Sequence, residues 1–337
     1  MKTARVHGAG VLRLHDEPMP AVRPGETLVR VTAVGVCGSD VHWWKEGAIG
    51  ADRIVTPLIL GHEFAGVIQG GPRNGERVAA DPACPCGKCE FCREGNPNLC
   101  SALHFAGHVP DDGALREYVA WPDHCLIPLP DSISETEGAL LEPLGVALYS
   151  VDCAPVKPGT SVGVFGCGVI GLCVIQAAQA AGASKIFATE LPGLEHRAGA
   201  ARSFGATVYE ARGGEEAGKI LAVTGGRGVD VAFEAAGDPE AVEAAVEAVK
   251  PGGHLILVGI PRDDRIAFTA SVARRKDLNI KVQHRMKNPY PRSIQLVKDG
   301  RVKIDSLVTH HFPLAEVERA YACAANREGI KVVVDCG

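Results

Sequence analysis

Apolar and polar residues follow two different patterns along this chain, and the pattern changes near residue 157. Up to about residue 150, short runs alternate apolar and polar side chains between Gly- and Pro-rich segments, as in Leu28–Val34 and Ala65–Gln69. Alternation with a period of two is typical of strands that bury one face. The first 150 residues are therefore predicted to form a mainly β domain.

Beyond Lys157, continuous apolar runs alternate with Ala-rich segments such as Val174–Ala181 and Ala241–Val249. The four runs, which follow one another at the spacing of βα units, are Ser161–Phe165, Lys185–Thr189, Val229–Glu234 and His254–Val258. Strands and helices that alternate in this way predict an α/β domain with a parallel sheet covered by helices on both faces.

The βα rhythm stops after about residue 288. There we expect strands at Ile304–Leu307 and Lys331–Asp335, with a helix at Leu314–Ala325 between them. The uncharged stretch Gly159–Ser184 has the length of a membrane span, but its glycines and glutamines favour a buried strand, a tight turn and a helix.

Composition narrows the class of protein. The chain has 337 residues, which predicts two or three domains, and its 40 acidic and 35 basic side chains give no reason to expect nucleic acid or an anionic membrane as partner. The first residues lack the apolar segment of a secretory leader, so we expect a cytoplasmic protein. In that compartment the 12 cysteines are expected to bind metal or to stay free thiols rather than to form disulfides.

A glycine-rich loop follows the first of the four apolar runs. Its glycines have the spacing of a dinucleotide-binding loop, in which they allow a sharp turn, close approach to a pyrophosphate and tight helix packing. The same spacing alone also suits a structural turn, and the preceding strand and following helix favour the nucleotide. The predicted contacts in this loop are Gly166, Gly168, Val169, Ile170 and Gly171.

Glu190 ends the next apolar run. A carboxylate there accepts hydrogen bonds from ribose hydroxyls and repels a 2′-phosphate, which favours NAD over NADP. Arg197 lies nearby and offers a cation that weakens this preference, while a plain surface acid is the alternative for Glu190. We expect NAD.

Four cysteines lie close together in a Pro- and Gly-rich segment. Cys86, Cys89, Cys92 and Cys100 have spacings of two, two and seven residues. Four thiolates at such spacing suit the closed tetrahedral shell of a structural zinc ion. A nucleic-acid zinc module is the alternative, but only Lys88 and Arg93 are basic here, against Glu90 and Glu94. Cys84 falls outside the regular spacing and is interpreted as a spare thiol.

A second candidate metal set is spread through the first domain. It comprises Cys37, the pair His62 and Glu63, and Glu142. One thiolate, one imidazole and one or two carboxylates can hold zinc and leave a position for water or substrate. Each residue alone is uninformative, and the interpretation rests on their combination with a nucleotide-binding domain.

With these motifs the chain resembles the zinc-dependent medium-chain dehydrogenase/reductase family over essentially its whole length. Gly61-His62-Glu63 is similar to the family's catalytic zinc signature, and the four cysteines to its structural lobe at about residues 84–101. Cys37–Gly50, Pro110–Gly113 and Glu142–Leu144 resemble the polyol (sorbitol, xylitol) dehydrogenases.

The resemblance implies a GroES-like, mainly β catalytic domain (residues 1–150 and 288–337) and a Rossmann domain with a doubly wound parallel sheet (residues 151–287). Catalysis is then expected in the cleft between them, in a homo-oligomer, a dimer or a tetramer.

The resemblance also implies roles for single residues. Cys37 and His62 are expected zinc ligands, with Glu63 and Glu142 supplying carboxylates, one directly and the other directly or through water. Ser39 and His42 are expected to relay a proton, although His42 is equally compatible with a structural role near the metal. Expected substrate contacts are Trp43, Glu142 and Arg285, and expected cofactor contacts beyond the glycine loop are Glu190, Arg197, Val258, Gly259, Ile260, His284 and Arg285. His284 and Arg285 are also compatible with a hinge.

Three positions depart from the polyol dehydrogenase pattern. Glu190 replaces the more usual Asp, and Trp43 and Met286 stand where those enzymes usually have tyrosine, so the hydrogen bonds to a polyol tail must differ. The expected reaction is transfer of a hydride from a secondary alcohol of a polyol to NAD, giving a ketose. The alternatives are the same chemistry on an amino alcohol, a cyclitol or a simple secondary alcohol, and a non-catalytic nucleotide-binding zinc protein.

Overall fold

The computed structural model describes residues 1–337, which divide into two units. Unit 1 comprises Met1–Glu142, Tyr290–Lys298 and Ile304–Gly337, and unit 2 comprises Pro143–Pro289 and Asp299–Lys303. The first boundary falls inside one continuous helix, α3 (Glu135–Asp152). The boundary that we expect from the sequence, at about residue 150, falls in the same helix.

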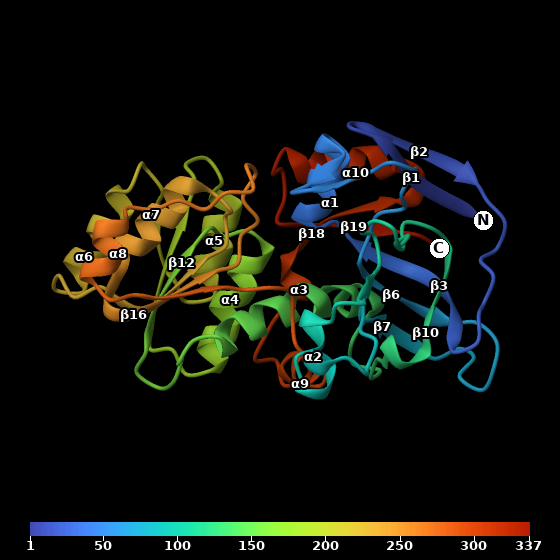
Figure 1. The fold of residues 1–337 in the computed structure, drawn as a ribbon, viewed down its shortest axis with the longest axis horizontal. Coiled ribbons are helices and arrows are strands. Elements are labelled where there is room, and N and C mark those ends of the chain that lie inside the picture. Colours follow the sequence, from blue (N-terminus) through green and yellow to red (C-terminus); the bar gives the residue numbers. More distant parts are fainter. The chain divides into compact units, whose positions relative to one another are not determined.

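Unit 1 is built on a seven-stranded sheet. Its strand order is β11–β7–β6–β3–β19–β18, and β10 also pairs with β3 (Figure 1). The longest strand, β3 (Glu26–Gly35), pairs antiparallel with β6 (Glu63–Ile68) and with β19 (Lys331–Asp335). Because these partners lie far from β3 in the sequence, the sheet brings distant segments of the chain to one place.

The other strands of this sheet are β7 (Arg77–Ala80), β10 (Tyr118–Pro122), β11 (Leu126–Pro128) and β18 (Val308–Pro313). Three two-stranded sheets join β1 (Lys2–Gly8) to β2 (Val11–Asp16), β4 (Ala48–Ile49) to β5 (Asp52–Arg53), and β8 (Ala83–Cys84) to β9 (His104–Phe105). The helices of the unit are α1 (Gly38–Glu46), α2 (Glu90–Arg93), α9 (Tyr290–Lys298), α10 (Val317–Ala325) and the short turns η1 (Pro97–Leu99), η2 (Asp123–Cys125), η3 (Asp305–Leu307) and η4 (Leu314–Glu316).

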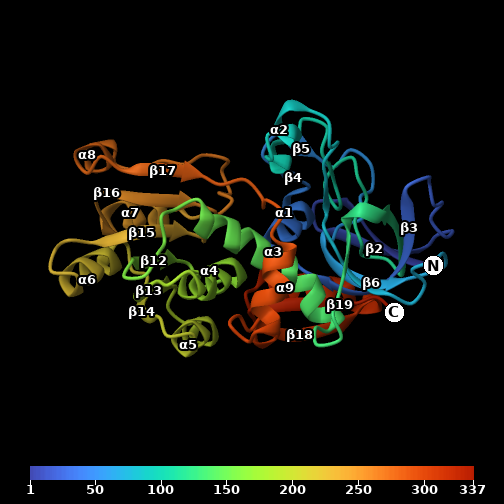
Figure 2. The same ribbon diagram turned by 90° about the horizontal axis from the view of Figure 1, so that it is seen from below.

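Unit 2 contains a six-stranded parallel sheet in the order β14–β13–β12–β15–β16–β17, which Figure 2 shows strand by strand. In sequence order within the unit this is 3-2-1-4-5-6, the doubly wound order of dinucleotide-binding domains. The strands are β12 (Ser161–Phe165), β13 (Lys185–Glu190), β14 (Thr207–Glu210), β15 (Val229–Glu234), β16 (Val249–Leu257) and β17 (Asn279–Val282). The helices are α4 (Val169–Ala180), α5 (Glu195–Ser203), α6 (Glu215–Val223), α7 (Pro239–Ala248) and α8 (Ala270–Arg275).

The central strand of this sheet explains why apolar runs predict it well. All five residues of β12 are buried, and a strand covered on both faces requires a continuous apolar run rather than alternation. The predicted α/β fold, with a mainly β unit and a parallel-sheet unit, is confirmed.

One sequence-based element is wrong. Ile304–Leu307 does not form a strand, because residues 305–307 form the single turn η3. Ile304 and Leu307 are both buried, and in a tight turn side chains three residues apart lie on the same side, so a run this short is compatible with either structure. The stretch Gly159–Ser184 forms β12 and α4, and none of the helices is long and apolar enough to cross a bilayer.

Candidate active site

Cys37, His62 and Glu63 meet at one end of the β3–β6 pair in unit 1. Glu63 lies opposite Gly35 in the register of these strands, and Cys37 follows β3 directly as the N-cap of α1. One ligand atom of each side chain lies within 4.8 Å of the others. His62 and Glu63 are buried, whereas Cys37 is partly accessible, so the group opens to solvent on the side of the thiol.

Asp40 contacts both Cys37 and His62 and orients them. Its carboxylate is fully buried, accepts a hydrogen bond from the Cys37 N–H at 3.1 Å and lies 3.2 Å from Nδ1 of His62. When Nδ1 carries the proton, Nε2 of His62 keeps the electron pair that can bind a metal ion. Burial disfavours a charged imidazole, but the charges of Asp40 and Cys37 outweigh it and hold the pKa of His62 above its usual value. The surroundings therefore attract a cation.

Lys331 adds a buried positive charge beside Glu63. It begins β19, lies in an ion pair with Oε2 of Glu63, and donates a hydrogen bond to the Val36 carbonyl at 2.9 Å. Gly35 leaves room for the pair, since a Cβ at that position would lie 2.1 Å from Glu63 Oε2 and 2.8 Å from Lys331 Cε. Burial opposes the charge on Lys331, but Glu63 outweighs it and raises the lysine pKa.

Glu142 is buried near this group without belonging to the set of atoms within 4.8 Å. Burial raises the pKa of its carboxyl to about 7, an effect that the charge of His62 reduces and that of Glu63 increases. Its side chain can therefore hold or release a proton near neutral pH.

The residues fit a zinc ion. A thiol, an imidazole whose Nδ1 is already engaged, and a carboxylate form a donor set that zinc prefers. Oε2 of Glu63 is buried and is compensated by the ammonium of Lys331 alone, so the other carboxylate oxygen remains for a cation.

Three other predicted residues lie on α1. Ser39 and His42 are partly exposed, and Nδ1 of His42 lies 3.3 Å from a carboxylate oxygen of Glu46. Trp43 is buried in the core of unit 1, with its ring edge-on to His108 at 5.3 Å between centroids. Their expected roles in proton relay and substrate contact stay predictions.

The four-cysteine segment forms a compact thiol cluster around α2 and η1. The sulfur atoms of Cys86, Cys89, Cys92 and Cys100 lie within 4.8 Å of one another. The N–H groups of Cys86 and Cys89 point at the sulfurs of Cys100 and Cys86, at 3.3 and 3.4 Å. Backbone hydrogen bonds lower the pKa of Cys86 to about 6. Four convergent sulfurs that accept N–H groups fit a structural zinc ion.

In unit 2 the glycine loop joins β12 to α4. Gly166 has a φ of 101°, in the left-handed region that glycine tolerates, and a Cβ on Gly171 would lie 1.9 Å from the Gly166 carbonyl oxygen. Gly168 is the N-cap of α4, and a Cβ added there would meet no atom within 4 Å. Val169 and Ile170 are the first two residues of α4. No side chain caps the N-terminal N–H groups of this helix, which therefore fit a pyrophosphate.

Glu190 ends β13 beside this loop. It accepts hydrogen bonds from the Cys167 N–H at 3.1 Å and from its neighbour Leu191 at 2.7 Å. A carboxylate has about four acceptor positions, so ribose hydroxyls remain compatible with both bonds. The charge of Arg197 acts on Cys167, which places this cation near the same loop.

The next parallel strands end at Glu234 and Leu257, which are register partners. Val258 and Gly259 donate hydrogen bonds to the Glu234 carbonyl at 2.9 and 3.1 Å, and Ile260 is half exposed. The Glu234 carboxylate, which is absent from the residues expected on sequence grounds, accepts the N–H groups of Ala236 and Gly237 at 2.7 Å each. These two bonds shape the loop after β15. The sequence signal that could have revealed Glu234 is an acidic residue at the end of an apolar run.

His284 and Arg285 follow β17. Burial lowers the pKa of His284, and Arg285 adopts a left-handed φ of 55°. Met286 is buried against Gly145, where a Cβ would lie 2.7 Å from its sulfur. Their expected contacts with cofactor or substrate stay predictions.

Comparison with protein families gives two matches. Residues 23–131 match the alcohol dehydrogenase GroES-like domain, and residues 169–299 match the zinc-binding dehydrogenase domain. The first match lies within unit 1, and the second covers most of unit 2 together with Tyr290–Lys298 of unit 1.

Curated relatives match along the whole chain. Sorbitol dehydrogenase of Bacillus subtilis is 36% identical and covers 99% of this chain and 97% of its own length. A probable D-xylulose reductase A of Emericella nidulans is also 36% identical, over 98% of this chain and 94% of its own length. The crystal structure of 2R,3R-butanediol dehydrogenase from Bacillus subtilis superposes with a TM-score of 0.88 at 30% identity, covering 100% of this chain and 99% of that one.

Proposed function

The chain belongs to the zinc-dependent alcohol dehydrogenase family with a GroES-like domain, and from this premise we propose that it oxidises a secondary hydroxyl of a polyol to a ketone with NAD. It is an oxidoreductase of the zinc- and nicotinamide-dependent type. The alternative of a non-catalytic zinc protein is wrong, since the relatives that match the whole chain carry the names of dehydrogenases and reductases.

One observation carries the proposal. Cys37, His62 and Glu63 converge within 4.8 Å, although a structural zinc requires only the separate four-cysteine cluster. When bound by these side chains, zinc supplies a Lewis acid that lowers the pKa of a substrate hydroxyl. Glu142, buried nearby with its pKa raised to about 7, is placed to add a further carboxylate or to hold a proton.

The surrounding side chains position this group. Asp40 keeps the proton of His62 on Nδ1 so that Nε2 faces the metal position. Lys331 holds one oxygen of Glu63, which limits Glu63 to at most one remaining oxygen for the ion. We assign proton transfer from substrate toward solvent to Ser39 and His42, because both lie on the accessible side of α1.

Unit 2 supplies the cofactor site, and NAD, when bound, accepts the hydride. The loop Gly166–Gly171 and the N-terminus of α4 fit its pyrophosphate, and Glu190 favours a ribose without a 2′-phosphate. Arg197 moderates that preference. Val258, Gly259, Ile260, His284 and Arg285 are assigned to the nicotinamide end of the cofactor.

A polyol is favoured as substrate by the names of two relatives, sorbitol dehydrogenase and D-xylulose reductase. Trp43, Glu142 and Arg285 are the assigned substrate contacts. A simple vicinal diol is the second candidate, because a butanediol dehydrogenase is among the similar solved structures. We further assign the enzyme to the cytoplasm, supported by twelve free cysteines, and to a homo-oligomer, as its family resemblance implies.

The test combines turnover with metal content. NADH formation is followed with sorbitol, xylitol, galactitol, 2,3-butanediol and threonine, with NAD and NADP in parallel. We expect the highest kcat/KM with a polyol and NAD, and Cys37→Ser to lose about 100-fold or more in turnover together with one zinc per chain. Undiminished turnover of Cys37→Ser with full zinc content would contradict the assigned centre, and a preference for butanediol would contradict the polyol.

A further inference from the structure

A third group of potential metal ligands lies in unit 1, outside both centres described above. It consists of Cys84 on β8 and the neighbours His124 and Cys125 on η2. One ligand atom of each lies within 4.8 Å of the other two, the same spacing that unites each of the other groups. Sequence spacing alone leaves Cys84 as a spare thiol and gives no sign of His124, because the two segments are far apart in the chain.

The geometry of this group matches a small thiophilic ion. Sγ of Cys84 lies 3.6 Å from Nε2 of His124. Ligand atoms around a tetrahedral zinc ion, with Zn–S about 2.3 Å and Zn–N about 2.0–2.1 Å, lie about 3.5–3.8 Å apart. The observed separation therefore needs no rearrangement to accept an ion between the sulfur and the nitrogen.

Hydrogen bonds hold the two segments together without a bound ion. The Asp81 N–H donates to the Cys125 carbonyl at 2.8 Å, and the Trp121 indole donates to the Asp81 carbonyl at 2.9 Å. Ala106 donates to the Pro82 carbonyl at 3.0 Å, which fixes β9 to the segment before β8. The donors are thus presented on a scaffold that is already formed, which reduces the entropy lost when an ion binds.

The accessibility of the three side chains is graded. Cys125 is buried, Cys84 is partly accessible and His124 is exposed. An ion can therefore enter from the side of His124 and reach two sulfurs, one of them shielded from water. His104, the register partner of Cys84, has its Nδ1 3.1 Å from Asp111 and does not belong to the group of ligand atoms within 4.8 Å.

We propose that Cys84, His124 and Cys125 form a third metal site that binds zinc or a softer ion of the same class through two thiolates and one imidazole. Binding releases the thiol protons to solvent, forms two metal–sulfur bonds and one metal–nitrogen bond, and changes no oxidation state. Three protein donors leave a fourth position for water or a small anion, in contrast to the closed shell of a four-cysteine structural site. The bound ion joins β8 to η2, just before the chain enters the four-cysteine segment.

The test counts ions in the untagged, zinc-loaded enzyme kept under a reductant. Zinc is titrated against a chelator of known affinity, and the ions per chain are read by native mass spectrometry. We expect three zinc ions in the wild type and two in Cys84→Ser. A Cys84→Ser variant that binds as many zinc ions as the wild type overturns the proposal, whatever that number is, and so does a Cys84–Cys125 disulfide that persists under the reductant.

His124→Asn separates this site from the lobe, because Cys84 stands two residues before the lobe ligand Cys86. His124 is exposed, so the variant is expected to fold normally. Its affinity for the third ion is expected to fall about 10- to 100-fold, while its affinity for the other two ions stays unchanged. An unchanged affinity for the third ion overturns the proposal. Cys153→Ser removes a thiol outside all three groups and serves as the matched control that keeps three ions.

The inference does not depend on the proposed function. His124→Asn is expected to keep its kcat with the best alcohol of the substrate panel, whereas failure of the proposed function appears in that panel with all metal sites filled.

Discussion

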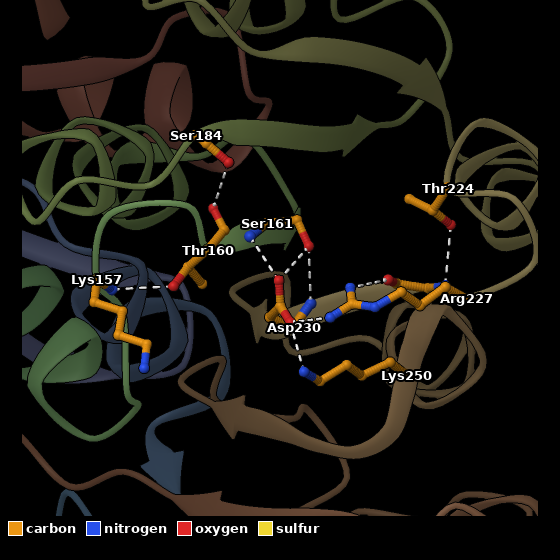
Figure 3. A network of polar contacts seen from close by, with 9 residues as sticks. Lys157, Thr160, Ser161, Ser184, Thr224, Arg227, Asp230 and Lys250 are labelled. Atoms are coloured by element: carbon orange, nitrogen blue, oxygen red, sulfur yellow. Dashed lines mark hydrogen bonds and ion pairs between the residues drawn. The ribbon is translucent and has the colours of Figure 1, made fainter.

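Two carboxylates with lysine partners, Glu63 in unit 1 and Asp230 in unit 2, show how a functional network differs from a structural one. Asp230 is saturated: one oxygen accepts Arg227 and Lys250, each at 2.6 Å, and the other accepts the Ser161 N–H and hydroxyl at 2.9 and 2.7 Å (Figure 3). Glu63 has a single partner, the buried cation Lys331 on its Oε2.

The difference lies in what each carboxylate has left to offer. The partners of Asp230 join β15 to β12, to β16 and to the segment before β15, so little capacity remains for a ligand. Glu63 is held by one ion pair beside a thiol and an imidazole, and burial without full hydrogen bonding is costly unless a further cation compensates it. Incomplete satisfaction in a buried group therefore points to function, and saturation points to structure.

The largest expected effect is on stability when Lys331 is replaced. Lys331→Met leaves Glu63 buried without its counter-charge, which typically costs about 3–5 kcal/mol. Lys250→Met, the matched control, leaves Asp230 with Arg227 and Ser161 in a partly exposed site and is expected to cost about 1 kcal/mol.

Urea unfolding measures both variants. All three tryptophans, at positions 43, 44 and 121, belong to unit 1, so their fluorescence reports that unit, while far-UV circular dichroism follows the secondary structure of both units together. Adding Glu63→Gln to Lys331→Met should recover part of the loss because it removes the uncompensated charge. Equal costs for Lys331→Met and Lys250→Met would show that the two networks do not differ in kind.

The second expected effect is on metal affinity. Asp40→Asn keeps the shape of the side chain but removes the charge that orients His62, which is expected to weaken zinc at the Cys37 group by about 10- to 100-fold. Chelator competition with zinc counting measures the loss, and the ion at the four-cysteine cluster should be unaffected. Asp16→Asn, on an exposed pair with Lys2, is the control. A full complement of tightly bound zinc in Asp40→Asn would remove Asp40 from the positioning of the centre.

Predictability from sequence follows the same division between local and distant partners. The four-cysteine cluster and the glycine loop are each formed within one short segment, so their spacing alone predicts them. Asp40 stands inside the Cys37–His42 motif, and an acid three residues after a helix N-cap was a usable signal for its bond to the Cys37 N–H.

Lys331 and the Cys84–His124–Cys125 group could not be found in this way. Their partners meet only because β3 pairs with both β6 and β19, and because η2 is bonded back to the segment before β8. The one local trace of Lys331 is a charged residue that opens an otherwise apolar strand. Ile304–Leu307 fails for the opposite reason, since four residues are too few to distinguish a strand from a turn.

The smallest expected effect is the acid sensitivity of the Asp230 network. Burial opposes ionisation, but Arg227, Lys250 and Ser161 outweigh it and hold the pKa of Asp230 below its usual value. A carboxylate with a lowered folded-state pKa contributes stability that is present above the unfolded pKa, about 3.9, and is lost as the pH falls below it. Because the side chain is a fifth exposed, we expect this contribution to be about 1–2 kcal/mol.

Asp230→Asn isolates this contribution. The variant should be less stable than the wild type by circular dichroism at pH 6. The difference should shrink as the pH falls from 5 to 3, because Asp230 takes up a proton in the unfolded state before it does so in the folded state. Its kcat and zinc content should stay at wild-type values, in contrast to Asp40→Asn. A stability difference that does not change over this pH range, or a loss of zinc in Asp230→Asn, would contradict the assignment of a saturated carboxylate to structure alone.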